Sequence, residues 1–523
     1  MPRKHQVSTL VDLSLISVGD FVIAFGKRLI QSICIASKTN PENSHVGLQS
    51  AIQLMKSILS TSVPRHIYDK MSVVVLNALV NLVNETKGTY NDYAITTAFL
   101  SEVTVVLHLT EVAVSSCLKS IEFSAWPKIM RHVLYNQLYD MVGLEVLDLG
   151  SGSAGWRTSD IEKIIINSVS RMPNLLSFTL CFDCTDNIIL ALAECCRKLQ
   201  KIDVTASRSV TDRSIGALLK CKYLREVKLF RTSVSTTGYA ELFVEHNGIE
   251  NIGRCDDFGH VMQLVQSKGS DFENSFRIIA FESRNFHMEH LYLLVDMCPY
   301  ITSLCLLRDE EINDLTILAA LNNLRELKLL SCDFYSHGIR TVLEVKGPTI
   351  ISLHLEHVDE IDLSALIDIS QFCPNITSLV LYNCDLLDHG PIYTRKLKIP
   401  PFRALERLKC AAECIGTHLE FLLSNCKNVK HIQLGSSTGI GDSLMTKILA
   451  ENPMTKLEEL KIVYSHDLSM NTVQLLMQNC KNLWRLSELE NWQGISSSEL
   501  HAFREELRSS NINLDTSPSV SFA

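Results

Sequence analysis

Leu144-Glu-Val-Leu147-Asp-Leu149 is the first copy of a pattern that returns as Leu324-Arg-Glu-Leu327-Lys-Leu329 and Ile376-Thr-Ser-Leu379-Val-Leu381. Copies begin at residues 144, 175, 199, 224, 301, 324, 350, 376, 405, 429, 457 and 483. The 339 residues between the first and last copies make thirteen steps of about 26, so two degenerate copies are expected near Ile249 and Phe276. A repeat of this length predicts a solenoid, because one unit buries its apolar face only against its neighbours.

Each repeat combines two kinds of periodicity. The apolar residues of each copy alternate, as in a strand that is buried on one face. Between copies, runs such as residues 161–169 and 473–477 have apolar residues three and four apart, which indicates amphipathic helices. We therefore expect an α/β solenoid with a curved parallel sheet inside and helices outside. Residues between the ladder leucines should face a partner protein, namely Glu226, Arg325, Lys328, Ser352, Thr377 and Lys430.

The cysteines follow the same repeat. A cysteine stands three residues before the pattern in five copies, at Cys221, Cys298, Cys373, Cys426 and Cys480. Small groups able to hydrogen-bond a turn follow the last ladder residue by three positions, among them Ser207, Thr232, Cys332 and Cys384. With these features, residues 144 to about 500 resemble leucine-rich repeats of the cysteine-containing subtype. That resemblance implies a strand, a turn and a helix in each unit.

Composition limits the class of protein. The 523 residues carry a net charge of −9, and no basic stripe points to nucleic acid. No run of eighteen uncharged apolar residues predicts a membrane span, and Asp12 and Asp20 interrupt the apolar N-terminal stretch that a signal peptide would need. The cysteines are therefore expected to be reduced, in a cytoplasmic or nuclear protein. Exposed strand residues of both signs are mixed, so charge gives no clue to the partner.

We expect the first 140 residues to carry no leucine ladder, and their sequence predicts helices at residues 8–32, 47–59, 64–83, 94–120 and 127–141. We expect three parts: a helical domain at 1–140, the solenoid at 141–505 and a disordered tail at 506–523. The helical domain would either only cap the apolar end of the solenoid or also bind a partner.

Thr9, Leu10, Ser14 and Val18 resemble the Elongin-binding box of the von Hippel-Lindau and SOCS families. Positions four apart share one side of a helix, so Leu10 would enter a partner's pocket, and Leu13 and Ile16 would face the helical domain. Val63, Pro64 and Ile67 resemble the start of the neighbouring cullin box, which implies contact with the scaffold. Lys70 stands where that box has an apolar residue, and the spacer between the boxes is long.

The order of box, helices and repeats resembles substrate receptors of cullin-RING ubiquitin ligases. It implies Elongin B/C and a cullin as partners, with an unidentified protein as cargo. The opening from Val63 also resembles an F-box, which implies a Skp-type adaptor instead, but the later Trp of that box is missing. A leucine-rich-repeat scaffold unrelated to ubiquitin is the remaining alternative.

Signatures of catalysis and of cofactor binding do not appear in the sequence. There is no G-x-S-x-G, P-loop, H-E-x-x-H or G-x-G-x-x-G motif. Cys181-Phe-Asp-Cys184 is a C-x-x-C, but no second one lies at a zinc-finger spacing. We therefore predict a non-enzymatic protein with no catalytic residue, cofactor or metal.

Overall fold

The computed structural model describes residues 2, 4, 6, 9–39, 41–89, 97–151, 158–267, 275–308, 312–387, 397, 399–413 and 416–519. The chain forms two compact units. The N-terminal unit is Val7–Gly253, and the C-terminal unit is Arg254–Ala523 together with Met1–Gln6. Each unit contains repeats, so the solenoid does not correspond to one of them alone.

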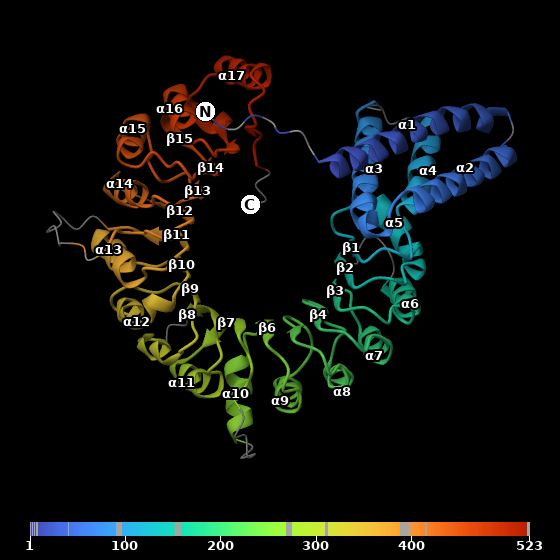
Figure 1. The fold of residues 1–523 in the computed structure, drawn as a ribbon. Helices are drawn as coiled ribbons and strands as arrows, with labels where there is room; N and C mark the ends of the chain where they lie inside the picture. Colours follow the sequence, from blue (N-terminus) through green and yellow to red (C-terminus); the bar gives the residue numbers. More distant parts are fainter. Residues whose placement is uncertain are drawn as a thin grey trace. The chain divides into compact units, whose positions relative to one another are not determined.

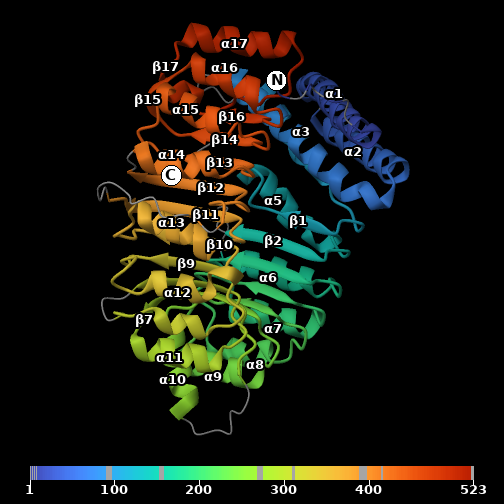
Figure 2. The same ribbon diagram turned by 60° about the vertical axis from the view of Figure 1, so that its left-hand side comes forward.

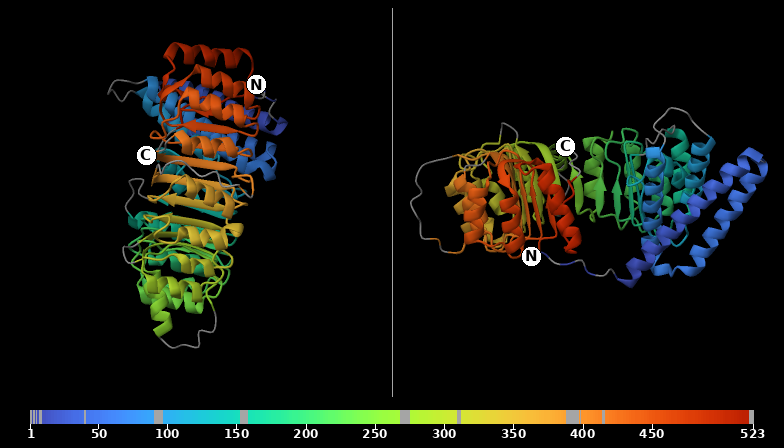
Figure 3. Two further views of the ribbon diagram at one scale, coloured as in Figure 1. Left: turned by 90° about the vertical axis from the view of Figure 1, so that its left-hand side faces the viewer. Right: turned by 90° about the horizontal axis from the view of Figure 1, so that it is seen from above.

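The helical part of the N-terminal unit contains α1 (Leu10–Thr39), α2 (Pro41–Ser62), α3 (Tyr68–Thr89), α4 (Thr97–Val112) and α5 (Lys128–Asn136). The long helices α1 and α2 lie side by side (Figure 3). All five predicted helices exist, but α1 ends at Thr39 and α2 begins at Pro41, so both extend into the gap between the first two predicted helices, 8–32 and 47–59. A short 3-10 helix, η1 (Arg65–Ile67), joins α2 to α3.

Glycines select the buried side of α1. Leu15, Gly19, Val22 and Gly26 are spaced by four, three and four residues, and they form the stripe that packs inward. A Cβ atom added at Gly19 would lie 3.1 Å from Val74 Cγ1 of α3. The absence of side chains at these positions lets the helices approach closely. The expectation that Leu13 and Ile16 face the helical domain is therefore wrong, since both are exposed.

The sheet of the N-terminal unit begins earlier than predicted. Its parallel strands are β1 (Ser120–Glu122), β2 (Val146–Ser151), β3 (Ser177–Cys181), β4 (Lys201–Asp203), β5 (Glu226–Lys228) and β6 (Asn251–Arg254). Helices α6 (Thr158–Val169), α7 (Asp186–Cys195), α8 (Ile215–Leu218) and α9 (Thr236–Glu245) pack along one face (Figure 1). The register places Ile121 opposite Leu147 and Leu147 opposite Phe178, so ladder residues stack into one buried row. The boundary predicted at residue 140 falls inside this sheet, after its first strand.

The C-terminal unit repeats the arrangement, with its strands stacked in chain order (Figure 2). The main sheet contains β7 (Ala280–Phe286), β8 (Ser303–Arg308), β9 (Glu326–Leu330), β10 (Ser352–Glu356), β11 (Ser378–Asp385), β12 (Arg407–Glu413), β13 (His431–Leu434), β14 (Glu459–Ile462) and β16 (Arg485–Ser487). Two further strands, β15 (Ser465–Ser469) and β17 (Trp492–Gly494), pair separately. The helices are α10 (Phe258–Ser267), α11 (Met288–Met297), α12 (Ile339–Lys346), α13 (Leu363–Phe372), α14 (Gly416–Asn425), α15 (Asp442–Glu451), α16 (Met470–Asn479) and α17 (Ser497–Ser509).

The two degenerate copies exist. Ile249 is buried and precedes β6 at the predicted position. In the second copy, Phe281 pairs with Leu304 and occupies the central ladder position, so the copy begins at Ile278, two residues after the predicted Phe276. The solenoid fold predicted from the leucine pattern is thus confirmed.

The turn after each strand is also periodic. A residue with positive φ follows the last ladder position by two in six repeats, at Phe182, Ala206, Arg231, Ser331, His357 and Asn383. The next residue then hydrogen-bonds turn backbone: Ser207 Oγ donates to Leu180 O of the preceding repeat at 3.3 Å, and Cys332 Sγ contacts Leu330 O of its own turn at 3.4 Å. The prediction that these small groups support the turn is confirmed at both places.

Aspartates link consecutive repeats at the helix starts. The buried Asp186 carboxylate of α7 accepts from Thr211 N at 2.9 Å, Thr211 Oγ1 at 2.7 Å and Ser214 Oγ at 2.5 Å. Asp442 of the other unit likewise accepts from Ser469 N at 2.9 Å. Each carboxylate satisfies donors that begin the next helix.

Asp186→Ala should destabilise the protein by about 2 kcal/mol, because it leaves three donors of the next repeat without their acceptor in a buried site. Urea unfolding followed by circular dichroism measures the loss. Asp140→Ala removes an exposed carboxylate of the same unit and should leave the midpoint unchanged. Equal midpoints for both variants would contradict a linking role.

Residues 506–519 do not form the disordered tail expected from their composition. Helix α17 extends to Ser509, and Ile512 and Leu514 are buried. Asp515 N donates to Trp484 O at 2.7 Å, and Leu486 N donates to Asp515 O at 2.9 Å, so this segment pairs with the free edge of β16. The physical reason is that an edge strand leaves backbone groups unpaired, and the tail satisfies them. That part of the domain prediction is wrong.

Candidate protein-binding surfaces

The start of α1 is set by a local cap. Thr9 Oγ1 accepts from Asp12 N at 3.1 Å and donates to Asp12 Oδ2 at 2.6 Å, so the helix begins at Leu10. Leu10 is 81% exposed, Ser14 is exposed and Val18 is half-buried. Ser14 Oγ donates to Leu10 O at 2.6 Å, which leaves it little reach beyond its own helix. The three predicted adaptor residues therefore share one side of α1.

The first two turns of α1 carry an apolar surface. Besides Leu10, the side chains of Val11, Leu13 and Ile16 are all more than 40% exposed, whereas Leu15 alone among the apolar residues of these turns is buried. A contiguous exposed apolar surface usually marks a contact site in a soluble protein. We call residues Leu10, Val11, Leu13 and Ile16 the α1 patch.

Residues of the second predicted box lie at the α2–α3 junction. Pro64 precedes η1 and accepts from Ile67 N at 3.1 Å, and Pro64 is exposed while Val63 and Ile67 are half-buried. Ligand pockets in proteins commonly have volumes of about 300–1,000 Å³. Here a hollow of about 750 Å³ is lined by Asp12 of α1 and Asp69 of α3, among others. The beginnings of α1 and α3 therefore border the same hollow.

The six residues predicted to contact the cargo occupy two kinds of position, within the strands and just before them. Glu226, Lys328 and Ser352 lie on strands, between buried ladder positions. Three others precede their strands by one residue and belong to the turns that enter them: Arg325, Thr377 and Lys430. The pattern contains two kinds of intervening position, and only those next to the central ladder residue lie within the strand.

Charges on the sheet of the N-terminal unit largely neutralise one another. Glu226 lies 3.1 Å from Lys201 Nζ and 2.8 Å from Lys228 Nζ. Burial opposes ionisation of Glu226, but the two lysines hold its pKa below the ordinary value. Burial, with Glu122 and Asp203 nearby, raises the pKa of Asp148 despite the hydrogen bond from Gly150.

The sheet of the C-terminal unit has a groove of about 540 Å³ across β11, β12, β13, β14 and β16. Its side chains form two rows set by the strand register. The first row contains Ser378, Arg407, His431, Glu459 and Arg485, and the second contains Val380, Lys409, Gln433, Lys461 and Ser487. We call these ten residues the basic groove, since they include four permanent cations and one carboxylate.

The prediction from sequence did not include the basic groove. Arg407, Lys409, His431, Lys461 and Arg485 were all absent from the predicted contact residues. The signal was present, because every one of them stands directly before or after a central ladder residue. The prediction considered the exposed charges of the whole chain together, and this concealed the local excess of positive charge on these strands.

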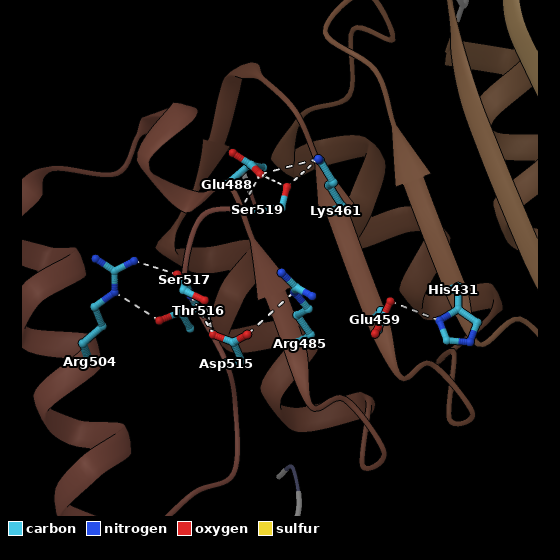
Figure 4. Close-up of polar contacts among 10 residues, drawn as sticks. All are labelled: His431, Glu459, Lys461, Arg485, Glu488, Arg504, Asp515, Thr516, Ser517 and Ser519. Carbon is cyan, nitrogen blue, oxygen red and sulfur yellow. Dashed lines mark hydrogen bonds and ion pairs between the residues drawn. The ribbon is translucent and has the colours of Figure 1, made fainter. Parts of the chain in front are cut away.

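The C-terminal segment closes one end of the basic groove (Figure 4). Asp515 Oδ2 lies 3.7 Å from Arg485 Nε, and Glu488 Oε1 lies 3.6 Å from Lys461 Nζ. Lys461 Nζ also donates to Ser519 Oγ at 2.5 Å. Farther along the sheet, Glu459 Oε2 lies 3.3 Å from His431 Nδ1. These contacts occupy the cations of β14 and β16, whereas the cations of β12 remain available to a ligand.

The cysteines are free thiols in the part of the chain that the structure describes. Burial raises the pKa of Cys181 to about 11 and of Cys426 to about 12, which disfavours the reactive thiolate. Within the described ranges, no three His, Cys, Asp or Glu side chains gather as a metal site would require. Among the same residues, no helix is long and apolar enough to cross a bilayer.

Comparisons with known proteins find matches among solved structures alone, at low sequence identity. No protein-family model matches the chain, and no curated protein matches it. An internalin from Listeria monocytogenes matches at 16% identity and a TM-score of 0.34, over 68% of this chain and 83% of its own. A leucine-rich-repeat protein of Leptospira interrogans matches at 13% and 0.35, over 79% and 91%. The Rad7 and Elc1 complex in yeast matches at 13% and 0.37, over 70% and 89%. By its own repeat, strand register and alternating helices, the chain has a leucine-rich-repeat-like solenoid fold that is preceded by helices.

Proposed function

We propose that this chain is a substrate receptor of a cullin-RING ubiquitin ligase in the cytoplasm or nucleus. The start of α1 would dock on Elongin B/C through Leu10, Ser14 and Val18, and the α2–α3 junction at Val63, Pro64 and Ile67 would lie near the cullin. The sheet faces would hold the cargo protein. The chain itself would catalyse nothing, and would only bring the cargo to the ligase.

The exposed α1 patch is the observation that supports this proposal. Leu10 is 81% exposed although it begins a helix that packs against α3 and α4 through its opposite side. Burying one such leucine is worth about 1.5–3 kcal/mol, so a partner that covers the patch gains affinity directly. The small Ser14, one turn after Leu10, allows close approach of a partner helix.

Leu10→Asp should reduce capture of Elongin B/C by at least about tenfold, because a charge would enter the partner's apolar pocket. Pull-down of purified Elongin B/C by the full chain measures this. The matched control is Leu54→Asp, which changes a leucine of α2 that is 59% exposed and should leave capture intact.

Three outcomes separate the alternatives. Equal capture by Leu10→Asp and the unchanged chain would exclude the Elongin box. Capture of a Skp-type adaptor, weakened by Pro64→Ala, would favour the F-box assignment. Capture of neither adaptor would exclude the ligase role and leave a scaffold protein.

A further inference from the structure

We propose that the basic groove binds an extended, acidic peptide segment of a partner protein, anchored by Arg407 and Lys409. The inference deepens the proposed function, because it names the kind of cargo segment that the sheet of the C-terminal unit would take. It concerns a surface remote in sequence from the α1 patch, so the two can be tested separately.

The charge of the groove is opposite to that of the chain. The chain carries −9 overall, whereas the groove contains Arg407, Lys409, Lys461 and Arg485 against one carboxylate, Glu459. Local sign, rather than net charge, decides which ligand a concave surface attracts.

Two of these cations lack an acidic partner. Glu488 neutralises Lys461, and Asp515 neutralises Arg485. Among the described residues, neither Arg407 nor Lys409 makes an ion pair, and Lys409 Nζ lies 5.1 Å from the Tyr382 ring centre. Arg407 is exposed and Lys409 is half-buried, so both can donate to a carboxylate without first breaking an ion pair.

The groove has the dimensions of a short peptide. It crosses five neighbouring strands, which span about 19 Å at 4.8 Å per strand, the length of roughly six extended residues. Ser378, Gln433 and Ser487 add neutral hydrogen-bonding groups along this path, and can satisfy backbone amides and carbonyls.

The C-terminal segment of the protein already places a carboxylate against a cation of the groove. The segment that contains Asp515 is extended along β16, and its carboxylate meets Arg485 (Figure 4). Ser519 also lines the groove. An acidic partner segment would continue the same kind of contact onto β12.

A protein segment fits this groove better than a nucleic acid. Apart from the Tyr382 ring beside Lys409 at its edge, the groove has no Phe, Tyr or Trp side chain in its lining on which bases could stack. Glu459 lines the groove, and Glu488 and Asp515 pair with two of its cations; these carboxylates would repel a continuous phosphate backbone, while a peptide with spaced charges avoids them.

Selection from a phage-displayed library of six-residue peptides on the full chain tests the inference without any adaptor. We expect the selected peptides to be enriched in Asp and Glu. A fluorescein-labelled selected peptide should bind Arg407→Glu/Lys409→Glu at least about tenfold more weakly, and replacing its acids by Gln and Asn should weaken binding similarly. Raising NaCl from about 50 to 300 mM should weaken it too.

The matched control is Lys427→Glu/Lys481→Glu, which makes the same change in charge at two exposed lysines outside the groove. The affinity of this control variant for the labelled peptide should be unchanged. Arg407→Gln/Lys409→Gln repeats the test without charge reversal, and circular dichroism verifies the fold of every variant.

Several results would overturn the inference: selection of no peptide, no enrichment in acids, equal binding by the anchor variants, equal loss in the control, or tighter binding of a single-stranded RNA hexamer than of the acidic peptide. If Elongin B/C capture survives these results, the ligase proposal stands without the groove. If acidic peptides bind but neither adaptor does, the groove stands without the ligase.

Discussion

Leu353→Ala should lower the free energy of unfolding by about 3–4 kcal/mol. Leu353 is fully buried at the centre of β10, where the register places it between Leu327 of β9 and Leu379 of β11. Truncation removes apolar contacts with both neighbours and leaves a cavity that rigid, hydrogen-bonded strands cannot fill by collapse. Urea unfolding measures the loss.

The damage should also be local, because repeats of a solenoid contact mainly their neighbours. Hydrogen exchange monitored by mass spectrometry should show faster exchange in β9, β10 and β11, with much less change in β14 and α15. Ser352→Ala, one residue earlier on the half-buried opposite face, serves as the control and should change stability by less than about 0.5 kcal/mol. Uniformly faster exchange would show that the unit unfolds as a whole.

The repeats could be predicted because each is specified locally and then copied. The missed repeat shows the limit of that approach. Leu118-Lys-Ser-Ile121-Glu-Phe123 precedes Leu144 by 26 residues, which is one period, and it forms β1. Ile and Phe in place of two leucines, directly after a long helical stretch, concealed it. The period would have identified it where composition did not.

The buried side of α1 could not be read from apolar residues, because Leu10, Val11, Leu13, Leu15, Ile16 and Val18 surround the helix on most sides. Tertiary packing decides among such faces, and here the decision depends on Gly19 and Gly26. Two glycines seven residues apart inside an apolar helix are a sequence signal for close packing. The tail shows a similar case: Ile512 and Leu514 alternate like a strand, but the partners of this segment are remote in sequence, with Lys4 opposite Ile512 and the edge of β16 opposite Asp515.

The residues that make up each candidate binding surface depend on the register of strand pairing, which a single sequence specifies only in part. The position of each strand residue could be predicted, but the prediction treated all intervening positions as equivalent and so included Arg325, Thr377 and Lys430. Strand pairing separates them from the rows that contain Lys328 and Lys409. The same rows bring charges from different repeats together, which explains the altered titration of His354.

Acidification should destabilise the protein through His354. Burial, then Lys328 and Lys409, lower its pKa to about 4, and they outweigh the attraction of Glu356 Oε2 at 3.3 Å. In the unfolded chain the imidazole titrates near 6.5. Between these values only the unfolded state binds the proton, so the stability that is present above pH 6.5 is lost as the pH falls toward 4. At pH 4.5 the loss should be about 2–3 kcal/mol.

Urea unfolding of the unchanged chain and His354→Gln at pH 7.5 and 4.5 isolates this effect, since other groups titrate alike in both proteins. Between pH 7.5 and pH 4.5 the unchanged chain should lose about 2–3 kcal/mol more stability than the variant does. His501→Gln, at an exposed position of α17, should follow the unchanged chain. Parallel curves for His354→Gln and the unchanged chain would mean that His354 accepts its proton in the folded state, with Glu356 prevailing over the lysines. In that case the positive potential beside β10 would be weaker than the row of cations implies, and the attraction of acidic partners to this face would be weaker as well.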